Sequence, residues 1–145
     1  MASENEHLEC ANRTHKTIEH LLADKNAHSP WVAIAAFYKA LHIVEAVFAN
    51  DRSVRNTSNH DEREHALKSA RKYQHIYEHY SPLKRASLNA RYLSEVSQFD
   101  CYLSPDDVVA KLLKHHLHQL EKSAGKFLTN AALLNSVASL NATKP

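Results

Sequence analysis

The scarcity of turn-forming residues is the strongest constraint on the fold of this chain. Its 145 residues include one glycine and four prolines. Tight turns and hairpins depend on these residue types, whereas the abundant alanine, leucine, lysine and glutamate favour helices. We therefore predict a mostly helical protein of one domain, which at this length can bury a hydrophobic core without disulfides or metals.

The same scarcity excludes two classes of nucleotide site. A P-loop and a dinucleotide-binding fingerprint each need several glycines at fixed spacing, and the chain has one. The formal net charge of +2 is too small to indicate nucleic-acid binding by itself. Unperturbed histidines titrate at about pH 6.5, so the twelve histidines predict a rising positive charge, and a rising affinity for phosphate, below that pH.

The cysteines and the N-terminus indicate the compartment. Cys10 and Cys101 are far apart and lack the spacing of a metal site, so we interpret them as free thiols in a reducing compartment. The first residues, MASENEHLE, are polar and do not form a signal peptide. We expect a cytoplasmic protein.

Capping residues and hydrophobic periodicity predict five helices and a tail. The start signals are a capping side chain, a proline in the first turn, or both, at Ser29-Pro30, Asn59 with Glu62, Ser81-Pro82 and Ser104-Pro105. The helices are expected at about residues 3–23, 29–50, 59–80, 81–97 and 104–125. The fold class is all-α, a single-domain up-down bundle over residues 1–125, with a small polar tail at 126–145 in which residues 131–140 can form a short helix. The side chains expected to face the core are Leu8, Ala11, Ile18, Leu21, Leu22, Trp31, Ile34, Tyr38, Leu41, Phe48, Val109, Leu112, Leu113, His116, Leu117 and Leu120.

The most apolar segment, WVAIAAFYKALHIVEAVFAN, carries polar residues at helical spacing. Lys39, His42 and Glu45 interrupt it, which is typical of a buried helix and argues against a membrane span. Tyr38, His42 and Glu45 form a polar stripe that must find partners if it is buried. This stripe is either a structural hydrogen-bond network or one wall of a functional cavity shared with His60.

The segment RNTSNH, residues 55–60, combines residue types that suffice for metal-free RNA cleavage. Arg55 can clamp a phosphate and stabilise the charge that builds on phosphorus. His60 can deprotonate the ribose 2′-hydroxyl or protonate the leaving oxygen, and Asn56 can orient either group. DNA would not be cut, because it lacks that hydroxyl. With twelve histidines in the chain, a solvated loop before a helix is the simpler interpretation of the spacing alone.

Three segments together resemble the HEPN family (higher eukaryotes and prokaryotes nucleotide-binding domain). They are WVAIAAFYKALHIVEAVFA, His60 with Arg63, and SLNARYL, which adds Arg91 and Tyr92. The resemblance covers about residues 29–120. It implies a bundle of four or five helices, commonly a homodimer, and many members are metal-independent ribonucleases of toxin–antitoxin, antiviral and RNA-processing systems.

The family's signature is an arginine followed after four to six residues by a histidine, often with Asn, Asp or His directly after the arginine. Arg55, Asn56 and His60 fit that form. The resemblance thus implies Arg55 and His60 as the catalytic pair, supported by Asn56, Tyr38, His42, Glu45, Arg63, Arg91 and Tyr92. It requires no cofactor.

Two histidine-rich segments are weaker candidates for metal sites. HIYEH places His75, Glu78 and His79 in the H-x-x-E-H zinc pattern, but a third ligand must come from elsewhere. In HHLH, His115 and His118 could pair across one helical turn. The predicted helix end at Ser81-Pro82 leaves HIYEH little scaffold for a site. For HHLH, a basic exposed face plus one core histidine, His116, is the simpler interpretation.

The sequence thus leaves two main functions open. The first is a HEPN-like metal-independent endoribonuclease that leaves 2′,3′-cyclic phosphate ends. The second is a catalytically inactive HEPN-like module that binds a nucleotide, an RNA or a partner protein through the same cleft. A third hypothesis is metal-dependent hydrolysis centred on His75, Glu78 and His79. Under either of the first two, we expect a homodimer, with a cognate antitoxin or regulatory protein as a further partner and no membrane association.

Overall fold

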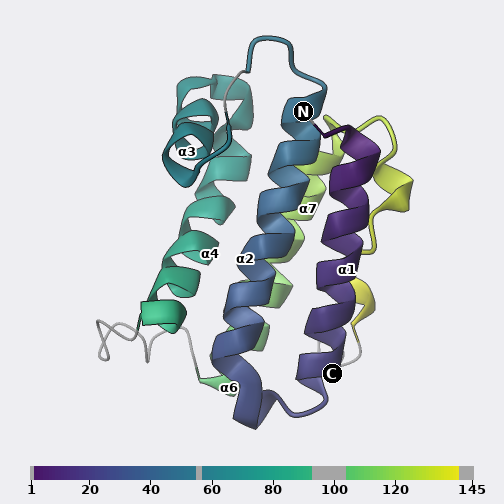
Figure 1. The fold of residues 1–145 in the computed structure, drawn as a ribbon. Coiled ribbons are helices and arrows are strands. Elements are labelled where there is room, and N and C mark those ends of the chain that lie inside the picture. The colour runs from purple at the N-terminus through teal and green to yellow at the C-terminus, as the bar shows by residue number, and fades with distance from the viewer. Residues whose placement is uncertain (1, 55–56, 93–103, 141–145) are drawn as a thin grey trace.

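The protein is a bundle of helices that run side by side (Figure 1). The computed structural model describes residues 2–54, 57–92 and 104–140, with only the backbone at 25–27 and 92. Three of the long elements are α1 (Glu4–Leu22), α2 (Lys25–Ala49) and α4 (Gln74–Tyr92), and a fourth helix ends with α7 (His118–Gly125). The short α3 (His60–Ser69) packs beside α4. These residues contain no strand, so the predicted all-α bundle is confirmed.

The N-terminal helix begins close to its predicted start at residue 3, but the second helix begins earlier than predicted. Ser3 and Glu6 form a reciprocal capping box at the start of α1. Pro30 was expected at the first position of the second helix, yet α2 already begins at Lys25 and Pro30 lies inside it. The connection from α1 is a short turn, in which His28 N donates to Asp24 O at 3.2 Å. Pro30 lies beyond the first four positions of α2, whose N–H groups need no helical partner, so it removes one hydrogen bond from the helix.

The prediction of one continuous helix over residues 59–80 is wrong, because the helix breaks at Ala70 and a second helix covers residues 74–80. The helix α3 ends at Ser69, where Ala70 takes an extended conformation with φ −106° and ψ 118°. A short 3₁₀ turn, η1 (Arg71–Tyr73), leads into α4. The predicted break at Ser81-Pro82 is also wrong, because α4 continues through Pro82 to Tyr92. Packing of the apolar face of α4 against α2 outweighs the hydrogen bond that the proline removes.

The last long helix begins and ends where the sequence predicts. Ser104 caps it by accepting from Asp107 N at 3.2 Å, and Pro105 is its first residue. It passes through α6 (Pro105–Asp107), a π-helical segment η2 (Val108–Leu117) and α7, which ends at Gly125. A π-helix is wider than an α-helix and is rare over this length.

The central helix α2 is buried by its neighbours. By length and composition, His28–Ala49 could cross a membrane, but 78% of its most apolar window is buried inside the bundle, as in the core helix of a soluble protein. Most of the expected core positions are buried or half-buried. Trp31 is the exception, at 62% exposed, and it lines a surface groove between α1 and α2. Cys10 carries a free thiol, and Cys101 lies outside the described residues.

The fully buried Lys39 contacts residues from three other parts of the chain. The Nζ atom of Lys39, on α2, lies 2.6 Å from Oε2 of Glu121 on α7. It also donates to the Asn135 carbonyl at 2.7 Å and to Nδ1 of His15, on α1, at 2.9 Å. All three donors of the ammonium are therefore used inside the protein.

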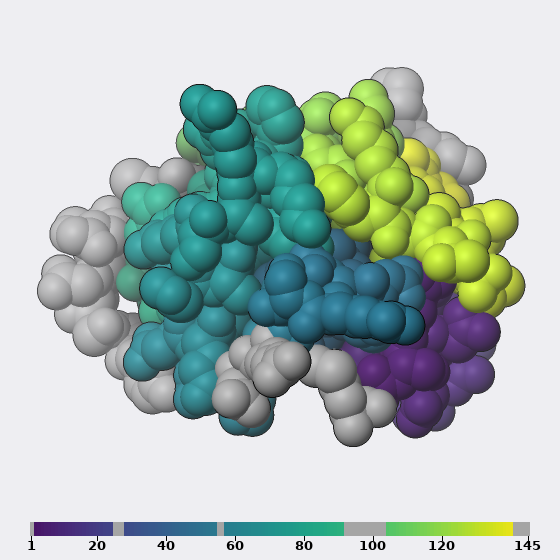
Figure 2. Space-filling model, turned by 90° about the horizontal axis from the view of Figure 1, so that it is seen from above, coloured from purple at the N-terminus to yellow at the C-terminus, as the bar shows by residue number. Residues whose placement is uncertain are grey.

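The polar segment after Gly125 is part of the packed fold. Instead of the expected short helix it forms two 3₁₀ turns, η3 (Ala131–Leu133) and η4 (Val137–Ser139). Leu128, Val137 and Leu140 are buried in the core. The Glu4 carboxylate accepts from Thr129 N at 2.8 Å and Asn130 N at 2.7 Å, which fixes this segment on α1. Figure 2 shows the yellow C-terminal segment against the purple α1.

Candidate functional site

The candidate site is built at the first turn of α3. Asn59 caps this helix by accepting from Glu62 N at 2.8 Å, as its spacing predicts, and His60 is the first helical residue. The preceding loop is fixed at its start by Asp51, which accepts from the Tyr73 hydroxyl at 2.5 Å and pairs with Lys72 at 2.9 Å. Arg55 and Asn56, the predicted clamp and its neighbour, lie outside the described residues.

A buried ion pair joins α3 to the central helix. Nε of Arg63 lies 2.6 Å from Oε1 of Glu45, and the two side chains are only 7% and 8% exposed. The other carboxylate oxygen of Glu45 accepts from the Thr57 hydroxyl at 2.8 Å. Arg63 also donates to the Thr57 carbonyl at 3.2 Å, which fixes the loop just before His60. Glu45 and Arg63 are therefore both satisfied, as buried charges must be.

The same arginine orients the ring of His60. Nη1 of Arg63 lies 3.1 Å from Nδ1 of His60. A guanidinium can only donate, so Nδ1 must accept, and the proton of the neutral ring is then on Nε2. The half-buried ring lies against Phe37, with 5.6 Å between ring centroids. Burial lowers the pKa of His60, and the positive charges of Arg63, Lys84 and Arg91 lower it further. His60 is therefore a neutral ring that offers an N–H donor.

Two residues of this cluster, Tyr80 and Lys84, were not predicted from the sequence. Tyr80 is fully buried against Phe37, at 5.4 Å between centroids, and its pKa is raised by that burial. Lys84 lies 2.6 Å from Glu64 and still contributes positive charge at His60. The only available signal was their spacing along α4, which brings positions 80, 84 and 91 to the side of the helix that meets α3.

The three side chains of the predicted polar stripe on α2, Tyr38, His42 and Glu45, lie in two separate surroundings. Glu45 belongs to the cluster, and His42 adjoins it, with Nδ1 at 3.4 Å from Nδ1 of His7 on α1. Burial lowers the pKa of His42. Tyr38 was expected beside His60 but lines a separate groove between α1 and α2 with Trp31 and Ile34. Tyr38 and Glu45 share one face of α2, but seven residues separate them by about 10 Å along the helix axis, so they meet different neighbours. Tyr92 ends α4, and its side chain lies outside the described part of the chain.

The H-x-x-E-H zinc pattern does not form a site on its own helix. The side chains of His75 and Glu78 are 79% and 51% exposed and lie 3.5 Å apart. His79 instead turns to the last helix, where its Nδ1 lies 3.1 Å from Nδ1 of His116. Burial and neighbouring positive groups lower the pKa of His116 to about 4, so its ring is neutral at pH 7.

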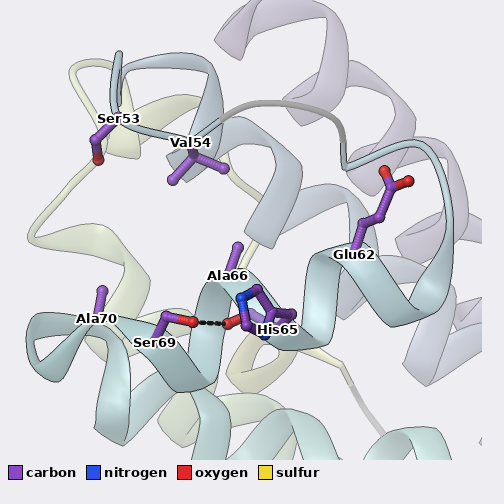
Figure 3. A pocket seen from close by; sticks show the side chains of 7 residues that line it. All are labelled: Ser53, Val54, Glu62, His65, Ala66, Ser69 and Ala70. Atoms are coloured by element: carbon purple, nitrogen blue, oxygen red, sulfur yellow. Dashed lines mark hydrogen bonds between the residues drawn. The ribbon is translucent and has the colours of Figure 1, made fainter.

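A surface hollow of about 550 Å³ lies on the opposite side of α3 from the cluster. It is lined by Ser53, Val54, Glu62, His65, Ala66, Ser69 and Ala70 (Figure 3). The Ser69 hydroxyl donates to the His65 carbonyl at 2.6 Å, which is a local helical contact. Its lining is mostly small side chains, and Glu62 points away from His65. We therefore place the candidate chemistry at His60 rather than in this hollow.

The chain matches no protein-family model, no curated protein and no solved structure. The function must therefore be argued from the geometry of the cluster. That geometry provides an oriented N–H donor at the start of a helix, flanked by cationic side chains and supported by a buried ion pair. Such an arrangement favours an anionic oxygen as the ligand.

Proposed function

We propose that this chain is a HEPN-like protein that binds the phosphate of an RNA or a nucleotide at the cluster of His60, Arg63, Glu45 and Arg91. The observation that carries the proposal is the 3.1 Å contact from Arg63 to Nδ1 of His60, anchored by the Arg63–Glu45 ion pair. It gives His60 one protonation state and one orientation before any ligand arrives. Preorganised donors of this kind bind anions without first ordering their own side chains.

The protonation of His60 favours binding over base catalysis. A general base needs a free lone pair within reach of the proton that it abstracts. In His60 the Nδ1 lone pair is used by Arg63, and Nε2 carries the proton. The ring can therefore donate to a phosphate oxygen as it stands, whereas it must release Arg63 to act as a base. Arg63 itself acts as a positioning residue, because Glu45, Thr57 and His60 use its donors.

Metal-independent RNA cleavage is the second candidate. It is favoured by the lowered pKa of His60, which keeps the ring unprotonated near neutral pH, and by the Arg55–His60 spacing that resembles the family signature. In this function Arg55 stabilises the charge on phosphorus and the 2′-hydroxyl is the nucleophile. A homodimer would place two such motifs across one cleft, and an antitoxin or regulatory protein would cover it. We expect this protein to act in the cytoplasm.

The experiment is binding of a fluorescently labelled single-stranded RNA, followed by anisotropy, with a labelled nucleotide in parallel. We expect His60→Ala to weaken binding at least about tenfold, the loss typical of one charge-assisted contact. His65→Ala is the matched control, because it removes an exposed imidazole from the same helix and should leave affinity unchanged. Equal affinity in wild type and His60→Ala would contradict the proposal.

The same samples distinguish cleavage from binding. Chelator-resistant production of 2′,3′-cyclic phosphate ends that is lost in both Arg55→Ala and His60→Ala would establish the nuclease function. Binding without such products would support the catalytically inactive binding module instead. Sedimentation of the same protein at micromolar concentration measures whether it is a dimer.

A further inference from the structure

Three imidazoles from two helices converge where α4 packs against η2. His79 lies on α4, and His115 and His116 lie on η2. One ring nitrogen of each lies within 4.8 Å of the other two. His79 precedes His115 and His116 by about 36 positions in the sequence. Only the packing of α4 against η2 brings the three side chains together.

The π-helical form of η2 brings two neighbouring histidines to the same side. Side chains at consecutive positions of an α-helix diverge, so both rarely reach one partner. A π-helix has more residues per turn, so consecutive side chains diverge less. The centroids of the His115 and His116 rings are 4.6 Å apart, and they lie 5.3 Å and 5.4 Å from the His79 ring.

The nitrogen spacing is close to that of a tetrahedral zinc ion. Zinc binds imidazole nitrogen at about 2.0–2.1 Å, which puts two tetrahedral ligands roughly 3.3 Å apart. The Nδ1 atoms of His79 and His116 are 3.1 Å apart. His115 is exposed, so its ring can complete the set by rotating about its own side-chain bonds.

The type of ligand selects the type of metal. The cluster offers three imidazoles and no carboxylate, which suits zinc, copper or nickel rather than magnesium or calcium. Three protein ligands also leave a fourth position for water, as in open zinc sites.

We propose that His79, His115 and His116 bind one Zn²⁺ ion that links α4 to the last helix. The ion binds the native arrangement more tightly than it binds the unfolded chain, so it stabilises the fold. The site is separate from the His60 cluster, and its failure or success leaves the proposed function untouched.

The test is a calorimetric titration of Zn²⁺ into the full chain after treatment with a chelator, together with thermal unfolding. We expect one equivalent to bind with a dissociation constant of micromolar or below and to raise the melting temperature. His79→Ala and His115→Ala should each weaken binding at least about tenfold, the loss expected on removing a ligand. His115 is exposed, so His115→Ala tests the site without altering the core.

His75→Ala is the matched control, because it removes an exposed imidazole one turn away on the same helix. It should bind Zn²⁺ as the wild type does. Weak binding of several ions that is equal in all variants would mean adventitious surface histidines and would overturn the proposal. Absence of binding, or loss with His75→Ala alone, would also overturn it.

Discussion

Lys39 shows at the scale of one residue how much a buried charge depends on its partners. Its side chain has no solvent exposure, and burial lowers its pKa while the Glu121 carboxylate acts in the opposite direction. A buried ion pair contributes little net stability over an apolar pair, but a buried charge without its partner is costly. Glu121 has the further role of accepting from Val137 N at 2.9 Å, which fixes the C-terminal segment.

We predict that Lys39→Met lowers the free energy of unfolding by about 3–5 kcal/mol, because it leaves the Glu121 carboxylate buried without a cation. The double variant Lys39→Met with Glu121→Gln should recover part of that loss, since it removes the charge as well. Urea unfolding measures both. Lys122→Met, on the exposed face of α7, is the control and should change stability by less than about 0.5 kcal/mol. A Lys39→Met variant as stable as the control would contradict this account.

At the scale of the element, Pro82 and Pro105 differ in cost because they differ in position. Pro105 occupies the first position of its helix, where no intrahelical donor is needed. Pro82 lies in the middle of α4, where it removes one hydrogen bond from the helix. The helix nevertheless continues, since Tyr80, Leu83 and Ala86 around it are fully buried. The tertiary contacts of α4 thus maintain a helix that its own sequence would interrupt.

We predict that Pro82→Ala raises the free energy of unfolding by roughly 1–2 kcal/mol, because it restores the donor and loses only the smaller entropic benefit of proline. Pro105→Ala is the matched control and should not stabilise. The urea unfolding midpoint of each variant, compared with that of the wild type, measures these changes. A destabilised Pro82→Ala variant would mean that the proline ring makes packing contacts worth more than the restored bond.

At the scale of the whole molecule, the histidines do not titrate together as the sequence predicts. Folding lowers the pKa of six of them, which are His7, His15, His42, His60, His79 and His116. For His15 the value falls to about 4, because burial and the charge of Lys39 both oppose protonation. Between pH 6.5 and 4 the unfolded chain takes up protons that the folded chain does not. Acid therefore favours the unfolded state.

We predict that the urea midpoint is level above about pH 7 and falls steadily from about pH 6.5 to 4. His15→Gln keeps an acceptor for Lys39 and does not titrate, so this variant should reduce the slope in that window. His20→Gln, at an exposed position of the same helix, should leave the slope unchanged. A stability that rises on acidification would contradict the lowered pKa values.

Part of the candidate site could be predicted from the sequence, and part could not. The capping pair of Asn59 and Glu62 locates His60 at a helix start, and helical spacing puts Arg63 beside it. Glu45 could be recognised as a buried charge that needed a partner. That its partner is Arg63, and that Tyr38 lies in another groove, depends on how α2 and α3 pack.

The sequence alone therefore determined the helical class, the capped starts at Asn59 and Ser104, and most of the buried positions. These properties are local, since they depend on side chains a few residues apart along one helix. Only the tertiary structure decided the partners of Lys39, the continuation of α4 through Pro82 and the meeting of His79 with His115 and His116. The physical reason is that hydrophobic periodicity identifies the buried face of each helix, but it carries no information about which other helix covers that face.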